Sequence, residues 1–216
     1  MESLYDDRTV SAISRLKEDV SALAHGLALA DQPSVEELNQ AIETRLLPRL
    51  LPDFPLVAAI CGGGSSGKST LFNTLAGAPV SPTGGRAGIN RRLLVALSAE
   101  HKDRPGVAAA VFDPFDCSPK PLGEQAQLAT PGDPLLNYAE ALAPGLALVD
   151  TPDFDTGAKG DYQNREMASL ALRAADVLIY IFTNANYNNR DNTDFVSRML
   201  TTVGTRSCFL VYRADP

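Results

Sequence analysis

A glycine-rich stretch in the first third of the chain carries residue types that bind phosphate groups. It fits the pattern GxxxxGK followed by Ser or Thr, as Gly62-Gly63-Gly64-Ser65-Ser66-Gly67-Lys68-Ser69. Glycines let the backbone curl so that several amides point at one anion. A helix predicted to begin near Lys68 adds its positive end, and Lys68 adds a charge for the outer phosphates. The Ser69 hydroxyl is placed to ligate Mg²⁺, so the stretch predicts a nucleoside triphosphate site with its metal.

A carboxylate for the same metal is expected at the end of a neighbouring strand. The segment 146–150 has four apolar residues followed by Asp150. In an open α/β sheet, ligands bind at the carboxyl ends of the strands, so Asp150 is a candidate metal residue. The alternative is that Asp150 only caps the turn that begins at Thr151-Pro152.

The elements that position these residues alternate between strands and helices. Apolar strand candidates are 56–61, 93–98, 107–112, 146–150, 177–182 and 207–212, and helical segments are 68–77, 162–175 and 189–202. This alternation predicts an α/β fold with a mostly parallel sheet and helices on both faces. The proline-containing stretch 114–144 is interpreted as a long excursion between strands, with a short helix near 123–129.

An N-terminal helical hairpin is predicted before this domain. Residues 8–30 repeat apolar positions at helical spacing, and a second helix should run from Ser34 to about Leu47. Ser34 and Glu37 form a predicted capping box at its start. We therefore divide the chain into a helical arm, 1–52, and an α/β domain, 53–216. The arm either packs on the next domain or binds a partner.

The composition is that of a globular protein with a sizeable core. Hydrophobic residues make up 44% and charged residues 21%, and the net charge of −7 argues against broad nucleic-acid binding. The cysteines Cys61, Cys117 and Cys208 are widely spaced and form no CxxC pair, which is typical of buried thiols in a reducing compartment. No apolar run reaches the roughly 20 residues of a membrane helix. We expect a cytoplasmic protein, and we leave peripheral membrane contact open.

Several motifs resemble those of the translation-factor-related GTPases, especially the Era-like and dynamin-like branches. Residues 67–77, GKSTLFNTLAG, are similar to the GKSTLxNxLxG signature of these proteins. Residues 149–153, VDTPD, resemble their DxPG motif, and Arg173-Ala174-Ala175-Asp176 resembles the step before their next strand. Residues 82–93 and 183–189 resemble the first switch and a polar loop of the dynamin-like branch.

The resemblance implies a P-loop GTPase domain that binds GTP and Mg²⁺. It implies that the base-reading motif falls at 212–215, and we expect the domain to be truncated after this strand. The implied catalytic residues are Lys68, Ser65 and Asp153, and the metal residues are Ser69 and Asp150. The implied nucleotide-binding residues are Gly62, Gly63, Gly64, Ser65, Ser66, Gly67, Lys68, Ser69, Thr70, Arg213 and Asp215.

The sequence also departs from the pattern of these GTPases. Asp153 replaces the DxPG glycine, and Phe154 stands where small signalling GTPases have a water-orienting glutamine. Gly64 stands where dynamin-like proteins often have a polar residue, Asn90 aligns with the threonine of the first switch, and Tyr212 breaks the base-reading motif. We therefore expect slow hydrolysis without a partner or self-association across the nucleotide face. The alternatives are a nucleotide-gated scaffold that does not hydrolyse GTP and an ATP-using P-loop protein.

Overall fold

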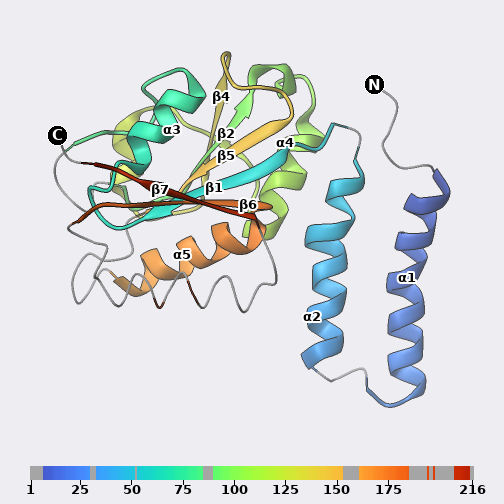
Figure 1. Ribbon diagram of the computed structural model, residues 1–216. Helices are drawn as coiled ribbons and strands as arrows, with labels where there is room; N and C mark the ends of the chain where they lie inside the picture. Colours follow the sequence, from blue (N-terminus) through green and yellow to red (C-terminus); the bar gives the residue numbers. More distant parts are fainter. Residues whose placement is uncertain are drawn as a thin grey trace. The chain divides into compact units, whose positions relative to one another are not determined.

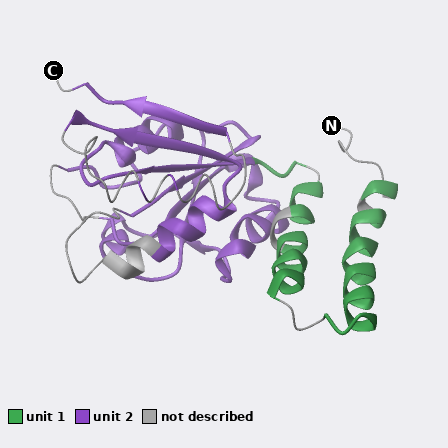
Figure 2. Cartoon of the chain, turned by 60° about the horizontal axis from the view of Figure 1, so that its bottom comes forward, with its two compact units in different colours: residues 1–55 green, residues 56–216 purple. Residues whose placement is uncertain are grey.

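The computed structural model describes residues 7–29, 33–51, 53–84, 90–152, 161–184, 194, 197 and 207–214. The chain divides into two compact units, Met1–Pro55 and Leu56–Pro216 (Figure 2). None of the helices within these described ranges is both long and apolar enough to cross a membrane.

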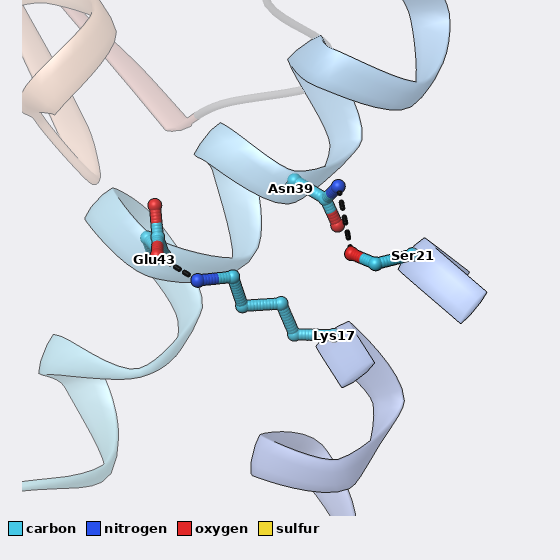
Figure 3. A network of polar contacts seen from close by, with 4 residues as sticks. All are labelled: Lys17, Ser21, Asn39 and Glu43. Carbon is cyan, nitrogen blue, oxygen red and sulfur yellow. Dashed lines mark hydrogen bonds and ion pairs between the residues drawn. The ribbon is translucent and has the colours of Figure 1, made fainter. Parts of the chain in front are cut away.

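The first unit is a pair of helices. Helix α1 spans Asp7–Gly26, helix α2 spans Pro33–Ala41, and a π-helical turn Ile42–Leu46 and a 3-10 turn Pro48–Leu50 follow. Two polar contacts join α1 to α2 and to the π-helical turn after it (Figure 3): Asn39 Nδ2 donates to Ser21 Oγ at 3.2 Å, and Lys17 pairs with Glu43. Helix α2 begins at Pro33, so Ser34 lies inside the helix. The prediction that Ser34 and Glu37 form a capping box at the helix start is therefore wrong. Proline suits the first helical position because it has no amide hydrogen to satisfy.

The second unit is built on one sheet (Figure 1). Its strands are β1 Leu56–Gly62, β2 Leu94–Ser98, β3 Lys120–Pro121, β4 Leu135–Ala139, β5 Leu146–Asp150, β6 Val177–Phe182 and β7 Ser207–Tyr212. Their order is β3-β4-β2-β5-β1-β6-β7. Among these strands only the β2–β5 pair is antiparallel, with Leu94 beside Asp150. The prediction of a mostly parallel sheet is confirmed.

Helices lie on both faces of this sheet, as predicted. Helix α3 spans Lys68–Ala76, α4 spans Pro105–Phe112 and α5 spans Asp161–Ala174. Figure 1 shows α3 and α5 on opposite sides of the sheet. The central strands are buried nearly throughout: in β1 only Leu56 is exposed, and all five residues of β2 are buried. Continuous apolar strands are what a sheet covered on both faces requires.

The elements between residues 105 and 144 differ in part from the prediction. Residues 107–112 form helix α4 and not a strand, because Pro105 begins a helix there and the whole run is apolar. Strands β3 and β4 were not predicted in the proline-containing stretch, whereas its expected short helix appears as a 3-10 helix, Gln125–Ala129. The helix predicted at 189–202 lies outside the described residues apart from Asp194 and Ser197.

Candidate nucleotide site

The phosphate loop joins the end of β1 to the start of α3, and its glycines are needed by the backbone. Gly62 has φ +154°, and a Cβ there would lie 2.3 Å from the Ile181 carbonyl oxygen. Gly67 has φ +103°, a region that L residues rarely adopt. Ser65 also has a positive φ, +56°. The turn therefore keeps the curled backbone that anion binding needs.

Lys68 is held under this loop. Its side chain is 5% exposed, and its ammonium donates to the carbonyls of Gly62 at 3.0 Å and Gly63 at 2.9 Å. The residue also lies in the first turn of α3, where the helix dipole favours an anion. The positive charge predicted from the sequence is thus fixed within the phosphate loop.

Ser69 and Asp150 meet although they are far apart in the chain. Asp150 ends β5 beside Ile60 of β1, and it is 1% exposed. The Ser69 hydroxyl donates to Asp150 Oδ2 at 2.9 Å. Thr151 fixes the strand end, because its amide and hydroxyl both donate to the Ile60 carbonyl, at 3.3 and 2.9 Å. The carboxylate therefore faces the first turn of α3, as the metal role predicted for Asp150 requires.

Two further polar residues complete this cluster. The Ser81 hydroxyl donates to Asp150 Oδ2 at 2.7 Å. The Asn90 carboxamide donates to Asp150 Oδ2 at 3.2 Å, to Ser69 Oγ at 3.0 Å and to Ser81 Oγ at 2.8 Å. Antiparallel pairing places the start of β2 beside the end of β5, which explains why Asn90 reaches Asp150. Sequence reasoning missed Ser81, whose only signal is a hydroxyl in the segment that leaves α3.

The donor set of this cluster fits Mg²⁺ that arrives with a nucleotide. Within the described part of the chain, no group of three or more His, Cys, Asp or Glu side chains could hold a metal. The cluster instead offers one carboxylate and the hydroxyls of Ser69 and Ser81. Mg²⁺ is usually bound through one or two carboxylates together with substrate phosphates. Such a site is incomplete without phosphates, which the adjacent loop is shaped to bind.

Arg213 contacts the phosphate loop from the end of β7. Its Nη1 donates to the Ser65 carbonyl at 2.9 Å, and its backbone amide donates to the Phe182 carbonyl at 2.9 Å. The neighbouring Tyr212 hydroxyl donates to Asn184 Oδ1 at 2.7 Å. Arg213 is thus placed beside the loop, while its contact with a base stays a prediction. Two of the expected site residues, Asp153 and Asp215, lie outside the described residues.

The Arg173–Asp176 motif binds the start of strand β1 through hydrogen bonds of Asp176. Asp176 Oδ2 accepts a hydrogen bond from the Val57 amide at 2.9 Å, and the Asp176 amide donates to the Val57 carbonyl at 2.8 Å. Both bonds fix the start of β1, the strand that leads into the phosphate loop. The motif therefore aligns β1 with β6 at the end of the sheet remote from the nucleotide site.

Cys61 lies beside the loop but has no role as a nucleophile. It is buried, and burial together with the nearby Cys208 raises its pKa to about 12, although Lys68 acts in the opposite direction. A thiol with this pKa remains protonated near neutral pH. The chemistry of the site therefore belongs to its lysine, hydroxyl and carboxylate groups.

A separate hollow of about 590 Å³ lies at the carboxyl ends of β2 and β4. The exposed ion pair of Lys102 with Glu140, at 3.0 Å, stands on its rim. Because β2 runs antiparallel to β5, this hollow lies at the end of the sheet opposite Asp150. It takes no part in the nucleotide site.

Several solved structures are similar to the chain at low identity. A variant of Aquifex aeolicus Era bound to GDP and aluminium fluoride is 18% identical, with a TM-score of 0.45, over 72% of this chain and 39% of that chain. Era in complex with MgGDPNP and a fragment of 16S ribosomal RNA is 18% identical, with a TM-score of 0.46, over 73% and 40%. A bacterial dynamin pair that tethers membranes is 14% identical, with a TM-score of 0.44, over 91% and 31%. The chain thus spans about two fifths or less of the length of these structures.

A comparison with curated proteins gave no match. The profile of one protein family, described as 50S ribosome-binding GTPase, matches residues 57–213, which run from β1 to the residue after β7. This range contains the phosphate loop, Asp150 and Arg213. The nucleotide of the site is accordingly GTP and its metal is Mg²⁺. The chain belongs to the 50S ribosome-binding GTPase family.

Proposed function

We propose that the chain hydrolyses GTP in a Mg²⁺-dependent reaction and acts as a nucleotide-controlled switch or as a dynamin-like mechanoenzyme domain. The observation that carries this proposal is the convergence of Lys68, Ser69 and Asp150 at the phosphate loop. We also propose that hydrolysis is slow unless a partner or a second copy of the chain contributes to the site.

The residues present can supply most of what phosphoryl transfer needs. This reaction depends mainly on positioning and on stabilising the charge of the transferred group. Lys68 and the loop amides would bind the outer phosphates, and Ser69 and Asp150 would hold Mg²⁺. Bound Mg²⁺ supplies neutralisation of the charge that develops on the phosphate oxygens.

The phosphate loop offers few side chains that could orient the attacking water. Gly64 has no side chain, and Ser66 is fully buried. Ser65 is the exposed hydroxyl of the loop, and Arg213 holds its carbonyl. We therefore propose Ser65 for this role, with Asp153 as the second catalytic candidate from the sequence. A single hydroxyl at the loop is a weak substitute for a glutamine, which supports slow turnover.

Single-turnover hydrolysis of GTP tests the proposal. The purified chain is compared with Lys68→Ala at low and raised protein concentration, with and without lipid vesicles. We expect measurable hydrolysis that falls about 100-fold or more in the variant, because an electrostatic contact to the transferred group is lost. Rates equal to those of Lys68→Ala under every condition would contradict hydrolysis and favour the nucleotide-gated scaffold.

Base preference and self-association are the finer parts of the proposal. We propose that Asp215 accepts hydrogen bonds from guanine and that Arg213 covers the base, so GTP should compete better than ATP for a fluorescent nucleotide. Equal competition by ATP would contradict this assignment. Self-association across the nucleotide face rests on the sequence likeness of residues 82–93 and 183–189 to the dynamin-like branch. Peripheral membrane contact is a separate part of the proposal. Sedimentation with a non-hydrolysable GTP analogue tests the first, and flotation with vesicles tests the second.

A further inference from the structure

The carboxamide nitrogen of Asn90 is surrounded by oxygens at the metal side of the site. Its three acceptors are Ser81 Oγ at 2.8 Å, Ser69 Oγ at 3.0 Å and Asp150 Oδ2 at 3.2 Å. Both hydroxyls donate their own hydrogens to Asp150 Oδ2. Their lone pairs therefore point toward the Asn90 nitrogen, whose two hydrogens carry partial positive charge.

A Mg²⁺ ion would need the same lone pairs. It binds oxygens at about 2.0–2.1 Å, closer than any hydrogen bond, so it and an amide nitrogen cannot share one ring of oxygens. We infer that the Asn90 amide nitrogen occupies the position of the cation, and that Ser81 is a further residue of the Mg²⁺ site. Metal binding then requires the Asn90 carboxamide to leave this position.

Ser81 is positioned as firmly as the residues of the phosphate loop. It is 1% exposed. The Asn73 side chain holds its backbone twice, because Asn73 Nδ2 donates to the Ser81 carbonyl at 2.7 Å and the Ser81 amide donates to Asn73 Oδ1 at 2.8 Å. Asn73 lies on α3, as Ser69 does, so one helix places both hydroxyls of the cluster. A hydroxyl fixed in this way is pre-organised for a ligand.

Among the described residues, only the nitrogen end of the Asn90 carboxamide has hydrogen-bond partners. Its residue is 8% exposed, and its Oδ1 accepts no hydrogen bond from any residue that the structure describes. A buried acceptor without a partner destabilises its arrangement. The carboxamide therefore gives up only its nitrogen contacts when the cation takes its place. The Asn90 carboxamide can therefore leave the cation position when Mg²⁺ binds, whereas Ser81 stays in place as a residue of the site.

The inference predicts opposite effects for two substitutions on metal affinity. Mn²⁺ binding to the GDP complex is measured by electron paramagnetic resonance in the whole chain. Asn90→Ala should bind Mn²⁺ about tenfold more tightly, because a competitor of the cation is removed. Ser81→Ala should bind it about tenfold more weakly, the range seen when groups around a metal are removed. Ser81→Thr should bind Mn²⁺ as tightly as the wild-type chain does, because threonine keeps the hydroxyl.

Controls separate these effects from loss of fold or of nucleotide binding. GDP affinity in EDTA should stay within about twofold of wild type in each variant, since a lost metal contact acts only when metal is present. Asn137→Ala, in β4, is the matched control and should leave Mn²⁺ affinity unchanged. The inference rests on the Mg²⁺ site of the proposed function, but GDP needs no hydrolysis, so a chain that fails to hydrolyse GTP still tests it.

Contrary results with either substituted chain would overturn the inference. Weaker Mn²⁺ binding by Asn90→Ala would show that the side chain is a ligand of the cation and not its competitor. Unchanged Mn²⁺ binding in Ser81→Ala would remove Ser81 from the site. If Asn90→Ala does not fold, nitrogen NMR of the wild-type chain is used instead. The side-chain amide signal of Asn90 is assigned by its absence from the spectrum of Asn90→Asp. This signal should shift when Mg²⁺ is added to the GDP complex. An unmoved signal would also contradict the exchange.

Discussion

At the scale of single residues, backbone geometry makes Gly62 irreplaceable and leaves Gly106 free to change. A Cβ on Gly62 would lie 2.3 Å from a backbone oxygen, whereas a Cβ on Gly106 meets nothing within 4 Å. We expect Gly62→Ala to lower the free energy of unfolding by about 2 kcal/mol or more, through strain and steric conflict. Gly106→Ala, inside α4, should raise it by about 0.5–1 kcal/mol. Urea unfolding of both variants measures the difference.

The same pair of variants can contradict the geometry. Equal stability of Gly62→Ala and Gly106→Ala would mean that the loop backbone can relax away from β6. GDP binding should be lost or strongly weakened in Gly62→Ala alone, because Gly62 begins the phosphate loop.

The reactivity of the cysteines is a second prediction at this scale. Because the pKa of Cys61 is raised to about 12, its thiolate is scarce at pH 8 and its sulfur is also buried. Burial raises the pKa of Cys117 and of Cys208 as well, but both thiols are only partly buried. Iodoacetamide at pH 8 should label Cys117 and Cys208 first and Cys61 only after unfolding, as peptide mass spectrometry would show. Early labelling of Cys61 would contradict its burial.

Sequence reasoning found the site residues that one continuous motif specifies. Lys68 and Ser69 follow from the spacing of the glycine-rich turn, and Asp150 follows from its place at a strand end. Ser81 could not be found in this way, because the side chain of Asn73 brings it to Asp150. Asn90 was named only by its alignment with the first-switch threonine, and its contact with Asp150 depends on the antiparallel pairing of β2 with β5. No short-range pattern in the sequence encodes that approach.

At the scale of elements, the strands that were predicted are those that a short-range sequence pattern encodes. Strands β1, β5 and β6 are apolar runs bounded by proline, glycine or polar residues. Their position in the sheet buries nearly all of β1 and β5 and half of β6. The run 107–112 is equally apolar, and periodicity alone does not separate a short buried strand from a short buried helix. Strand β4 was missed because proline and glycine precede it, although its pairing with β2 is regular.

The two hydrogen bonds of Asp176 give a prediction for the sheet. We expect Asp176→Ala to lower the free energy of unfolding by about 1–2 kcal/mol, because the Val57 amide loses its side-chain acceptor. GDP affinity should change by less than about twofold, since the contact lies at the opposite end of β1 from the phosphate loop and acts on stability alone. Asp103→Ala is the matched control, because Asp103 is exposed and should change neither quantity. Weakened GDP binding by folded Asp176→Ala would place the residue in the site after all.

At the scale of the whole molecule, the chain consists of two units with different degrees of burial. In the first unit Ala24, Ile42 and Leu50 are buried, whereas Leu23 is 67% and Leu27 is 61% exposed. The helical pair therefore leaves much of the apolar stripe of α1 uncovered. The second unit has a continuous core around β1, β2 and β5 and contains every described residue of the nucleotide site.

This division predicts that the helical arm can be removed without loss of nucleotide binding. A chain lacking residues 1–52 keeps Leu56 and the hydrogen bond that the Leu56 amide donates to the Gly145 carbonyl, so β1 can still enter the sheet. We expect its GDP affinity to stay within about twofold of that of the full chain, because the site residues lie in one compact unit. Titration of a fluorescent GDP analogue measures this, and circular dichroism checks the fold. A folded but non-binding truncated chain would mean that the arm contributes to the site, and the leucines Leu23 and Leu27 would then be the first positions to substitute.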